Sequence, residues 1–214
     1  MHRDVYDVVR ERYVHAVENA IVGDPFGEVL YGPMIDEKYL ENHDKHLGLI
    51  QDHQTVYGSS SVGRITSTNP RRGFLGDPDA GWFAHPTIVD GVRPGDTLYS
   101  TETFGPLVTM GVFDSLDEAI ELSNGHGYGL SCAIYTENPQ AVWRYRAGVS
   151  AGMMSVNNST SGAEAHLPFG GNGLSGNGSR QSGIWVLDQF TRWQSMNWDY
   201  SGKLQKAQMD LVEL

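Results

Sequence analysis

The chain has 214 residues, one cysteine and a formal net charge of −11 at pH 7. An acidic balance without a basic cluster argues against nucleic acid as a partner, and a single cysteine excludes an intrachain disulfide framework and is typical of a reducing compartment. No apolar run approaches the roughly 20 residues of a membrane-spanning helix, and the first residues carry no apolar signal region. We therefore expect a cytoplasmic protein with no membrane partner.

The first quarter of the chain predicts two helices. Asp4 is placed to cap the first, whose apolar residues repeat at three- and four-residue spacing until Gly23-Asp24-Pro25 ends it. Such an apolar face needs a partner sheet. Asp36 caps the second helix, which carries His43 and His46 three positions apart. This spacing suits a metal pair, but no third ligand is near in sequence, so we interpret both as polar residues on a helix surface and predict no metal site.

A loop-rich segment, residues 58–81, follows. It contains Arg71 and Arg72, which could bind an anion, but no helix N-terminus or further base accompanies them, and we interpret them as a solvated loop pair. Residues 82–89 are typical of a strand, but Pro86 interrupts them. Because proline donates no hydrogen bond to a ladder, this segment is predicted to be an edge strand or irregular.

The clearest pattern occupies the middle of the chain. Apolar strands are predicted over 107–113, 130–135 and 152–157, separated by helices that begin with a capping box at Ser115 and with Pro139 at the first helical position. An alternating strand–helix order favours parallel strands covered on both faces. The predicted fold class is therefore α/β, with a mainly parallel open sheet and helices on both faces.

The C-terminal segment is predicted to be a short helix, an edge strand and a tail. Residues 184–188 are expected to be helical, and residues 190–198 alternate apolar and polar side chains as an exposed strand does. Large apolar residues on such an edge suggest pairing with another chain. The last dozen residues form a polar tail. We accordingly divide the chain into a domain over 1–188 and an oligomerisation strand with its tail over 189–214.

Glycine occupies five of the nine positions from Gly170 to Gly178, which requires close backbone packing or positive φ angles. Within this loop, residues 171–176 match the dinucleotide-binding pattern G-x-G-x-x-G. That fingerprint follows a buried strand and opens a helix, whereas here a Leu-Pro-Phe sequence precedes it and no helical pattern follows. We therefore interpret the glycine-rich loop as backbone that closes over a site or cleft.

Three further features could carry chemistry. Cys132 lies inside an apolar strand and is interpreted as a structural core cysteine, because a nucleophilic thiol needs a polar setting that lowers its pKa. Glu102 could accept hydrogen bonds from a diol and Phe104 could lie against a flat ring, although a surface Glu and a core Phe are the alternative. Residues 157–163 leave a strand end, where ligands bind in α/β sheets, and a plain loop is equally compatible.

Together these segments resemble the aldehyde dehydrogenase superfamily nearly end to end. Each motif alone is weak, but their order and spacing are specific. The resembling motifs are Val22-Gly-Asp-Pro25, Gly32-Pro33, Gly81-Trp-Phe83 with Pro86-Thr87, Glu102-x-Phe-Gly-Pro106, Asn124-x-x-x-Tyr-Gly-Leu130, Gly152-Met153 with Val156-Asn157, Pro168-Phe-Gly-Gly171 and Ser175-Gly-x-Gly178.

The resemblance implies oxidation of an aldehyde to an acid with NAD or NADP, through attack by a cysteine, hydride transfer and thioester hydrolysis. It implies that Glu102 holds the nicotinamide ribose hydroxyls and that Phe104 lines the nicotinamide pocket. The loop around residues 161–163 is similar to family branches that take semialdehydes. The residues it assigns to the aldehyde's tail are Ser161, Gly162, Ala163 and Phe169.

The departures from the family limit this expectation. The family's nucleotide-binding domain, base Glu, oxyanion Asn and nucleophilic Cys all lie upstream of what matches Met1, and Cys132 does not align with the nucleophile. Gly173 stands where a basic residue often follows the double glycine. The chain thus resembles only the C-terminal part of such an enzyme, and we predict no catalytic residue in it and no activity alone.

The resemblance leaves three alternatives open. The chain could be one subunit of a split enzyme completed by a separate N-terminal chain, a non-catalytic interaction protein on the same fold, or a truncated product. The Glu102–Phe104 pair favours the first, since a chain free of cofactor does not need it. Apolar surface left without neighbours predicts a homo-oligomer or such a complementary chain as partner.

Overall fold

The computed structural model describes residues 1–58 and 61–203. Its helices are α1 (Arg3–Asn19), α2 (Glu37–Leu47), α3 (Leu116–Asn124), α4 (Pro139–Gly148) and α5 (Leu187–Phe190). Its strands are β1 (Val22–Gly23), β2 (Thr55–Tyr57), β3 (Phe74–Leu75), β4 (Thr87–Asp90), β5 (Leu107–Met110), β6 (Tyr128–Gly129), β7 (Ser131–Ile134), β8 (Met153–Val156) and β9 (Asn172–Gly173). Short 3-10 helices are η1 (Pro78–Ala80), η2 (Thr97–Tyr99) and η3 (Ile184–Val186).

The α/β class is confirmed, but the predicted single open sheet is replaced by four small sheets within the described residues. Their orders are β1-β3, β2-β4-β5, β6-β9 and β7-β8, with parallel pairing in β1-β3, β4-β5 and β7-β8 and antiparallel pairing elsewhere. The strands β5 and β7 do not pair. Strand β7 pairs with β8, and all residues of β7 are partly exposed, so the β7-β8 sheet is not covered on both faces as predicted.

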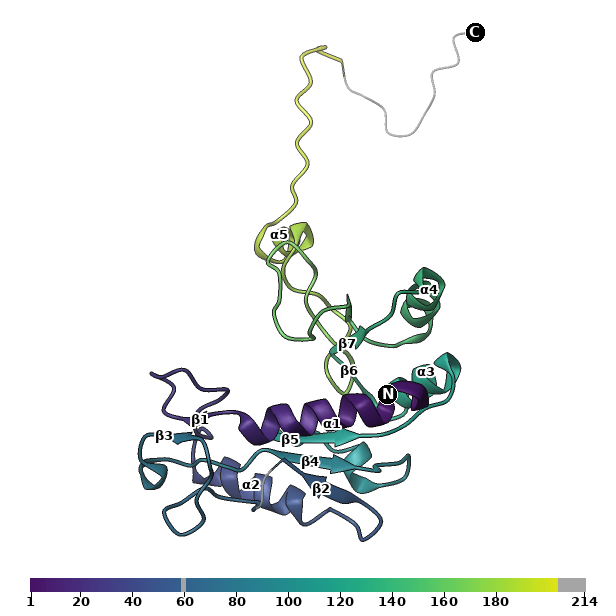
Figure 1. The fold of residues 1–214 in the computed structure, drawn as a ribbon. Coiled ribbons are helices and arrows are strands. Elements are labelled where there is room, and N and C mark those ends of the chain that lie inside the picture. The colour runs from purple at the N-terminus through teal and green to yellow at the C-terminus, as the bar shows by residue number, and fades with distance from the viewer. Residues whose placement is uncertain (59–60, 204–214) are drawn as a thin grey trace.

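The helix α1 lies along the three-stranded sheet, as Figure 1 shows. Its Val17 packs against Ile88 of β4 and Met110 of β5 in one core cluster. The N-cap is His2, whose Nδ1 accepts from the Asp4 amide at 3.2 Å, and not Asp4 itself. Other apolar residues of α1 stay exposed, which confirms the predicted apolar surface; they are Val5, Val8, Val9 and Tyr13.

The strand β4 is the centre of its sheet, which corrects the predicted edge assignment. It lies between antiparallel β2 and parallel β5, and its four residues Thr87–Asp90 are buried. Pro86 directly precedes the first paired residue, so its missing N–H costs the ladder nothing. The ladder begins instead at Thr87, whose amide donates to the Pro106 carbonyl at 2.8 Å.

The two helices of the second half follow their predicted caps. Ser115 Oγ accepts from the Glu118 amide at 3.2 Å, and Pro139 is the first residue of α4. The structure also confirms the capping of α2, where Asp36 accepts from the Tyr39 amide at 3.1 Å. Local capping chemistry therefore predicted these three helix starts correctly.

Arg71 is not part of a solvated loop pair. It is 7% exposed, whereas the adjacent Arg72 is exposed. Its guanidinium lies at the C-terminal end of α1, where carbonyl groups have no helical partner. The acceptors of its hydrogen bonds are the carbonyl oxygens of Val17, Glu18, Ala20 and Gly58.

After α5 the chain runs out as an extended arm, seen at the top of Figure 1. The helical prediction for 184–188 is confirmed by η3 and α5. Residues 191–203 form no ladder within the described residues, and Trp193 is 84% exposed. The pairing of residues 190–198 with another chain stays a prediction, and the predicted polar tail lies almost entirely outside the described residues. Among the described residues no helix is long and apolar enough to cross a membrane.

Candidate functional site

The segment that joins η2 to β5 presents Glu102 and Phe104 to solvent. Phe104 has φ 36° and is 69% exposed, so the core alternative for this residue is wrong. A positive φ is strained for a phenylalanine and persists only where the surroundings hold the backbone. Glu102 is also exposed, and its carboxylate makes no hydrogen bond or ion pair within residues 1–58 and 61–203. Two residues apart, the loop thus offers an unused carboxylate and a free aromatic face.

The helix α2 lies beneath this loop. His46 Nδ1 lies 3.1 Å from the Thr103 carbonyl oxygen. His43 packs under Gly105 so closely that a Cβ on Gly105 would lie 2.7 Å from His43 Nδ1. Both imidazoles are buried, which corrects the prediction that they lie on a helix surface. Burial lowers the pKa of His43, which therefore favours its neutral form.

An open cavity of about 430 Å³ brings two of the predicted elements together. Glu102 lines it on one side, and Ser175 of the glycine-rich loop lines it on another. Cys132 of β7 and Tyr145 of α4 contribute to its wall. The structure therefore places the predicted cofactor loop and the glycine-rich loop at one cavity, although they are about seventy residues apart in sequence.

The surroundings of Cys132 disfavour its thiolate form. It is half-buried, and burial raises its pKa although a hydrogen bond with the Tyr145 hydroxyl acts in the opposite direction. A raised pKa leaves less thiolate at neutral pH, and the thiolate is the nucleophile. The side chain lies in a cavity wall and not in a closed core, which corrects the prediction of a core cysteine.

The glycine-rich loop is packed on itself and on its neighbours. Phe169 and Gln181 exchange backbone hydrogen bonds of 2.6 and 2.7 Å, which closes the loop at its base. A Cβ on Gly152 would collide with the carbonyl oxygen of Gly170. No helix opens from residues 171–176, as the prediction against a dinucleotide fingerprint requires. Four of the five glycines of the loop make close backbone contacts, as predicted, whereas Gly178 has open space but a positive φ.

The Arg180 side chain stabilises this loop through hydrogen bonds to its residues, and no motif in the sequence predicted that role. Its guanidinium donates 2.8 Å to the Asn172 side-chain oxygen and 2.9 Å to the Gly178 carbonyl. Further bonds reach the carbonyl oxygens of Gly171 and Ser179. One side chain therefore ties together both arms of the loop.

The predicted substrate residues lie apart from the cavity lining. Ser161, Gly162 and Ala163 are on an exposed loop after β8, where Ser161 and Ser159 hydroxyls lie 2.7 Å apart. Phe169 is half-buried at the base of the glycine-rich loop. None of these four residues lines the cavity that Glu102 lines.

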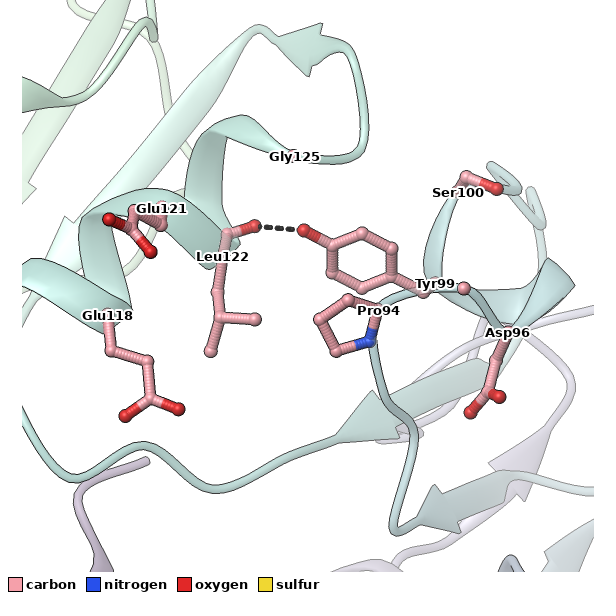
Figure 2. A pocket seen from close by; sticks show the side chains of 9 residues that line it. Pro94, Asp96, Tyr99, Ser100, Glu118, Glu121, Leu122 and Gly125 are labelled. Carbon is pink, nitrogen blue, oxygen red and sulfur yellow. Dashed lines mark hydrogen bonds between the residues drawn. The ribbon is translucent and has the colours of Figure 1, made fainter.

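A second cavity, of about 590 Å³, lies between η2 and α3 (Figure 2). Tyr99 reaches across it and donates 2.7 Å to the Leu122 carbonyl. Of its acidic residues, Asp96 already accepts from the Arg93 amide and Glu118 from the Asp114 amide. Among the described residues no group of three or more His, Cys, Asp or Glu could hold a metal ion.

Comparison with known proteins places these features in context. The sequence matches the profile of the aldehyde dehydrogenase family over residues 1–196. It is 31% identical to the benzaldehyde dehydrogenase (NAD(+)) of Pseudomonas putida over 92% of this chain and 38% of that protein. It is 32% identical to 1-pyrroline-5-carboxylate dehydrogenase 1 of Halalkalibacterium halodurans over 86% of this chain and 33% of that protein.

The fold is also similar to that of a solved aldehyde dehydrogenase. The NAD+ complex structure of aldehyde dehydrogenase from Bacillus cereus superimposes with a TM-score of 0.75 and 28% identity, covering 89% of this chain and 36% of that chain. Across these three proteins, the chain spans between 33% and 38% of the relative's length.

Proposed function

This chain belongs to the aldehyde dehydrogenase family, and we propose that it forms the C-terminal portion of an NAD(P)-dependent enzyme that oxidises an aldehyde to a carboxylic acid. The observation that carries the proposal is the loop over α2, where an unused carboxylate and a free aromatic ring stand two residues apart. The activity of the whole relatives is assigned here only to the enzyme of which this chain is a part.

The residues present fit the cofactor. Glu102 would accept hydrogen bonds from the ribose hydroxyls, because an ionised carboxylate is an acceptor only. Phe104 would lie along the nicotinamide ring, since its face is unobstructed. When bound, NAD or NADP supplies the acceptor for hydride. The strained backbone at Phe104 supports this role, because strain of this kind is concentrated at ligand sites.

The exposed loop carrying Ser161, Gly162 and Ala163, together with Phe169, would contact the tail of the aldehyde. Relatives bear names as different as benzaldehyde dehydrogenase and alpha-ketoglutaric semialdehyde dehydrogenase. The resemblance of residues 161–163 to semialdehyde-oxidising branches leads us to include semialdehydes among the candidate substrates. The exposure of residues 161–163 fits a substrate channel whose other wall comes from a different segment or chain.

The 214-residue chain supplies no catalytic residue by itself. Its single cysteine has a raised pKa, and covalent attack on an aldehyde needs a thiolate. We therefore propose that it turns over no aldehyde alone. The alternative of a split enzyme, completed by a separate N-terminal chain, is favoured over a non-catalytic interaction protein by the Glu102–Phe104 pair, since a chain free of cofactor does not need it.

The partner proposed is a second copy of the chain or such a complementary chain. Residues 1–188 would form the partial catalytic domain, and residues 189–214 the oligomerisation strand and tail. The exposed aromatic side chains of the arm support this division, because large apolar surface marks an interaction site. A clean monomer in sedimentation at micromolar concentration would count against it. The single cysteine supports a cytoplasmic location.

The proposal is tested by complementation. The chain is co-expressed with the part of the Pseudomonas putida benzaldehyde dehydrogenase that it does not match, and aldehyde-dependent cofactor reduction is measured. Restored activity, with a KM for NAD that rises about tenfold or more in Glu102→Ala, supports the cofactor role, because a lost charged hydrogen bond is worth about 1.5–3 kcal/mol. Restored activity whose KM for NAD is unchanged in Glu102→Ala would overturn that role.

A further inference from the structure

Three supports hold the backbone between Glu102 and β5. The Thr103 carbonyl meets His46, the Gly105 Cα rests on the His43 ring, and the Pro106 carbonyl accepts from the Thr87 amide. The last belongs to the sheet. The other two come from neighbouring turns of α2, because positions three apart share one face of a helix.

The geometry at His46 fixes its protonation at one ring nitrogen. A carbonyl oxygen can only accept, so the 3.1 Å contact requires a hydrogen on Nδ1. The neutral ring then carries its lone pair on Nε2. The bond therefore restrains Thr103, the residue between Glu102 and Phe104, from the side of the protein interior.

His43 supports the loop by filling the space under Gly105. It is fully buried, and neither ring nitrogen has a hydrogen-bond partner within the described residues. Leaving such a group unpaired costs about 1–3 kcal/mol, which packing at this position must offset. The ring fills the space directly under Gly105, and Met34 approaches the same point.

We propose that His46 and His43 are positioning residues that hold Glu102 and Phe104 in the orientation the cofactor meets. The inference rests on the proposed function for what the loop binds, but the positioning itself concerns contacts within this chain. His46 acts by a directional hydrogen bond and His43 by filling space. The two side chains therefore respond differently to substitution.

The test for His46 uses nuclear magnetic resonance on the purified chain. Asparagine places its amide nitrogen at the position of Nδ1 and keeps a donor, whereas leucine keeps volume without a donor. We expect His46→Leu to lower the backbone order parameters of residues 102–105 from about 0.85 to below about 0.6, because the Thr103 carbonyl loses its donor, and His46→Asn to restore most of the order. His15→Leu, on the exposed face of α1, is the matched control.

The imidazole nitrogen shifts of the unmodified chain give an independent reading. A protonated Nδ1 on His46 at neutral pH is expected. An unprotonated Nδ1, or equal effects of asparagine and leucine at position 46, would overturn the role of His46.

The test for His43 compares a variant that keeps the side-chain volume with one that removes it. His43→Leu should leave the backbone order parameter at Gly105 near its original value, while His43→Ala should lower it to below about 0.6 through the cavity it leaves. Equal order parameters in both variants would overturn the role of His43. Because none of these readouts uses enzyme activity, failed complementation would count against the proposed function and leave the positioning result intact.

Discussion

The guanidinium of Arg71 donates a 2.6 Å hydrogen bond to the carbonyl oxygen of Val17, so a buried cation ends the first helix. This bond couples the loop-rich segment to α1, fifty-four residues away in sequence. A positive charge at this position also interacts favourably with the helix macrodipole. Burial lowers the pKa of Arg71, but it stays a cation because the group's ordinary pKa is far above neutral.

Replacing Arg71 with Met should therefore lower the free energy of unfolding by about 2–4 kcal/mol, because several buried carbonyl groups lose their donor. Arg72→Met is the matched control: the side chain is exposed, and a change within about 0.5 kcal/mol is expected. Urea unfolding followed by circular dichroism measures both. Equal midpoints for the two variants would show that Arg71 does not hold the end of α1.

Stability should fall on mild acidification. Burial lowers the pKa of His43 and of His85 below the ordinary value of 6.5. Above about pH 6.5 both the folded and the unfolded chain keep these rings neutral, so they add no pH dependence there. Below that pH the unfolded chain takes up protons that the folded chain excludes, and the free energy of unfolding decreases until the folded pKa is passed.

His43→Leu isolates one share of this effect. It removes a titrating group and two unpaired buried nitrogens, so we expect a gain of about 1 kcal/mol at neutral pH and a shallower loss in acid. Chemical unfolding at a series of pH values gives the slope, and His15→Leu serves as the exposed control. An unchanged slope in His43→Leu would mean that His43 is not the group that titrates.

Gly152, which packs against the glycine-rich loop, and Gly178, which belongs to it, should differ in how well they tolerate alanine. Gly152 has no room for a Cβ, which would collide with the Gly170 carbonyl, whereas Gly178 has open space but φ 87°. Gly152→Ala should cost about 3 kcal/mol because backbone must move, and Gly178→Ala about 1–2 kcal/mol of conformational strain alone. Thermal unfolding ranks the two. The reverse order would contradict close packing as the reason for this glycine density.

The Cys132 thiol should label slowly. Because its pKa is raised by burial, the rate with a disulfide reagent at neutral pH should be below that of free cysteine, and the inflection of the pH–rate profile should lie above the ordinary thiol pKa. Tyr145→Phe, which removes the hydroxyl beside the sulfur, should raise that pKa further. Fast labelling with an inflection near neutral pH would reopen a catalytic role for this residue.

Local patterns in the sequence predicted more than long-range ones. The helix starts at Asp36, Ser115 and Pro139 depend on neighbours within four residues, and they are where the pattern placed them. Strand partners could not be predicted in this way: β4 is central although Pro86 suggested an edge, because only the ladder register shows that the proline precedes the first paired residue.

The sequence patterns also did not predict which charged and polar side chains are buried. Nothing in the sequence distinguishes Arg71 from Arg72, or marks His43 and His46 as interior, because each acquires its partners from a segment more than fifty residues away or from a close approach to Gly105. Only the resemblance to a known family assigned Glu102 and Phe104 to a cofactor site. Their common cavity with the glycine-rich loop required the structure.

The most direct measurement is cofactor reduction by the purified 214-residue chain alone, with NAD or NADP and a panel of aldehydes that includes semialdehydes. The proposed function predicts no reduced cofactor above the rate without protein, and no difference between the unmodified chain and Cys132→Ser, because the single thiol is not the nucleophile. Aldehyde-dependent turnover that disappears in Cys132→Ser would contradict it.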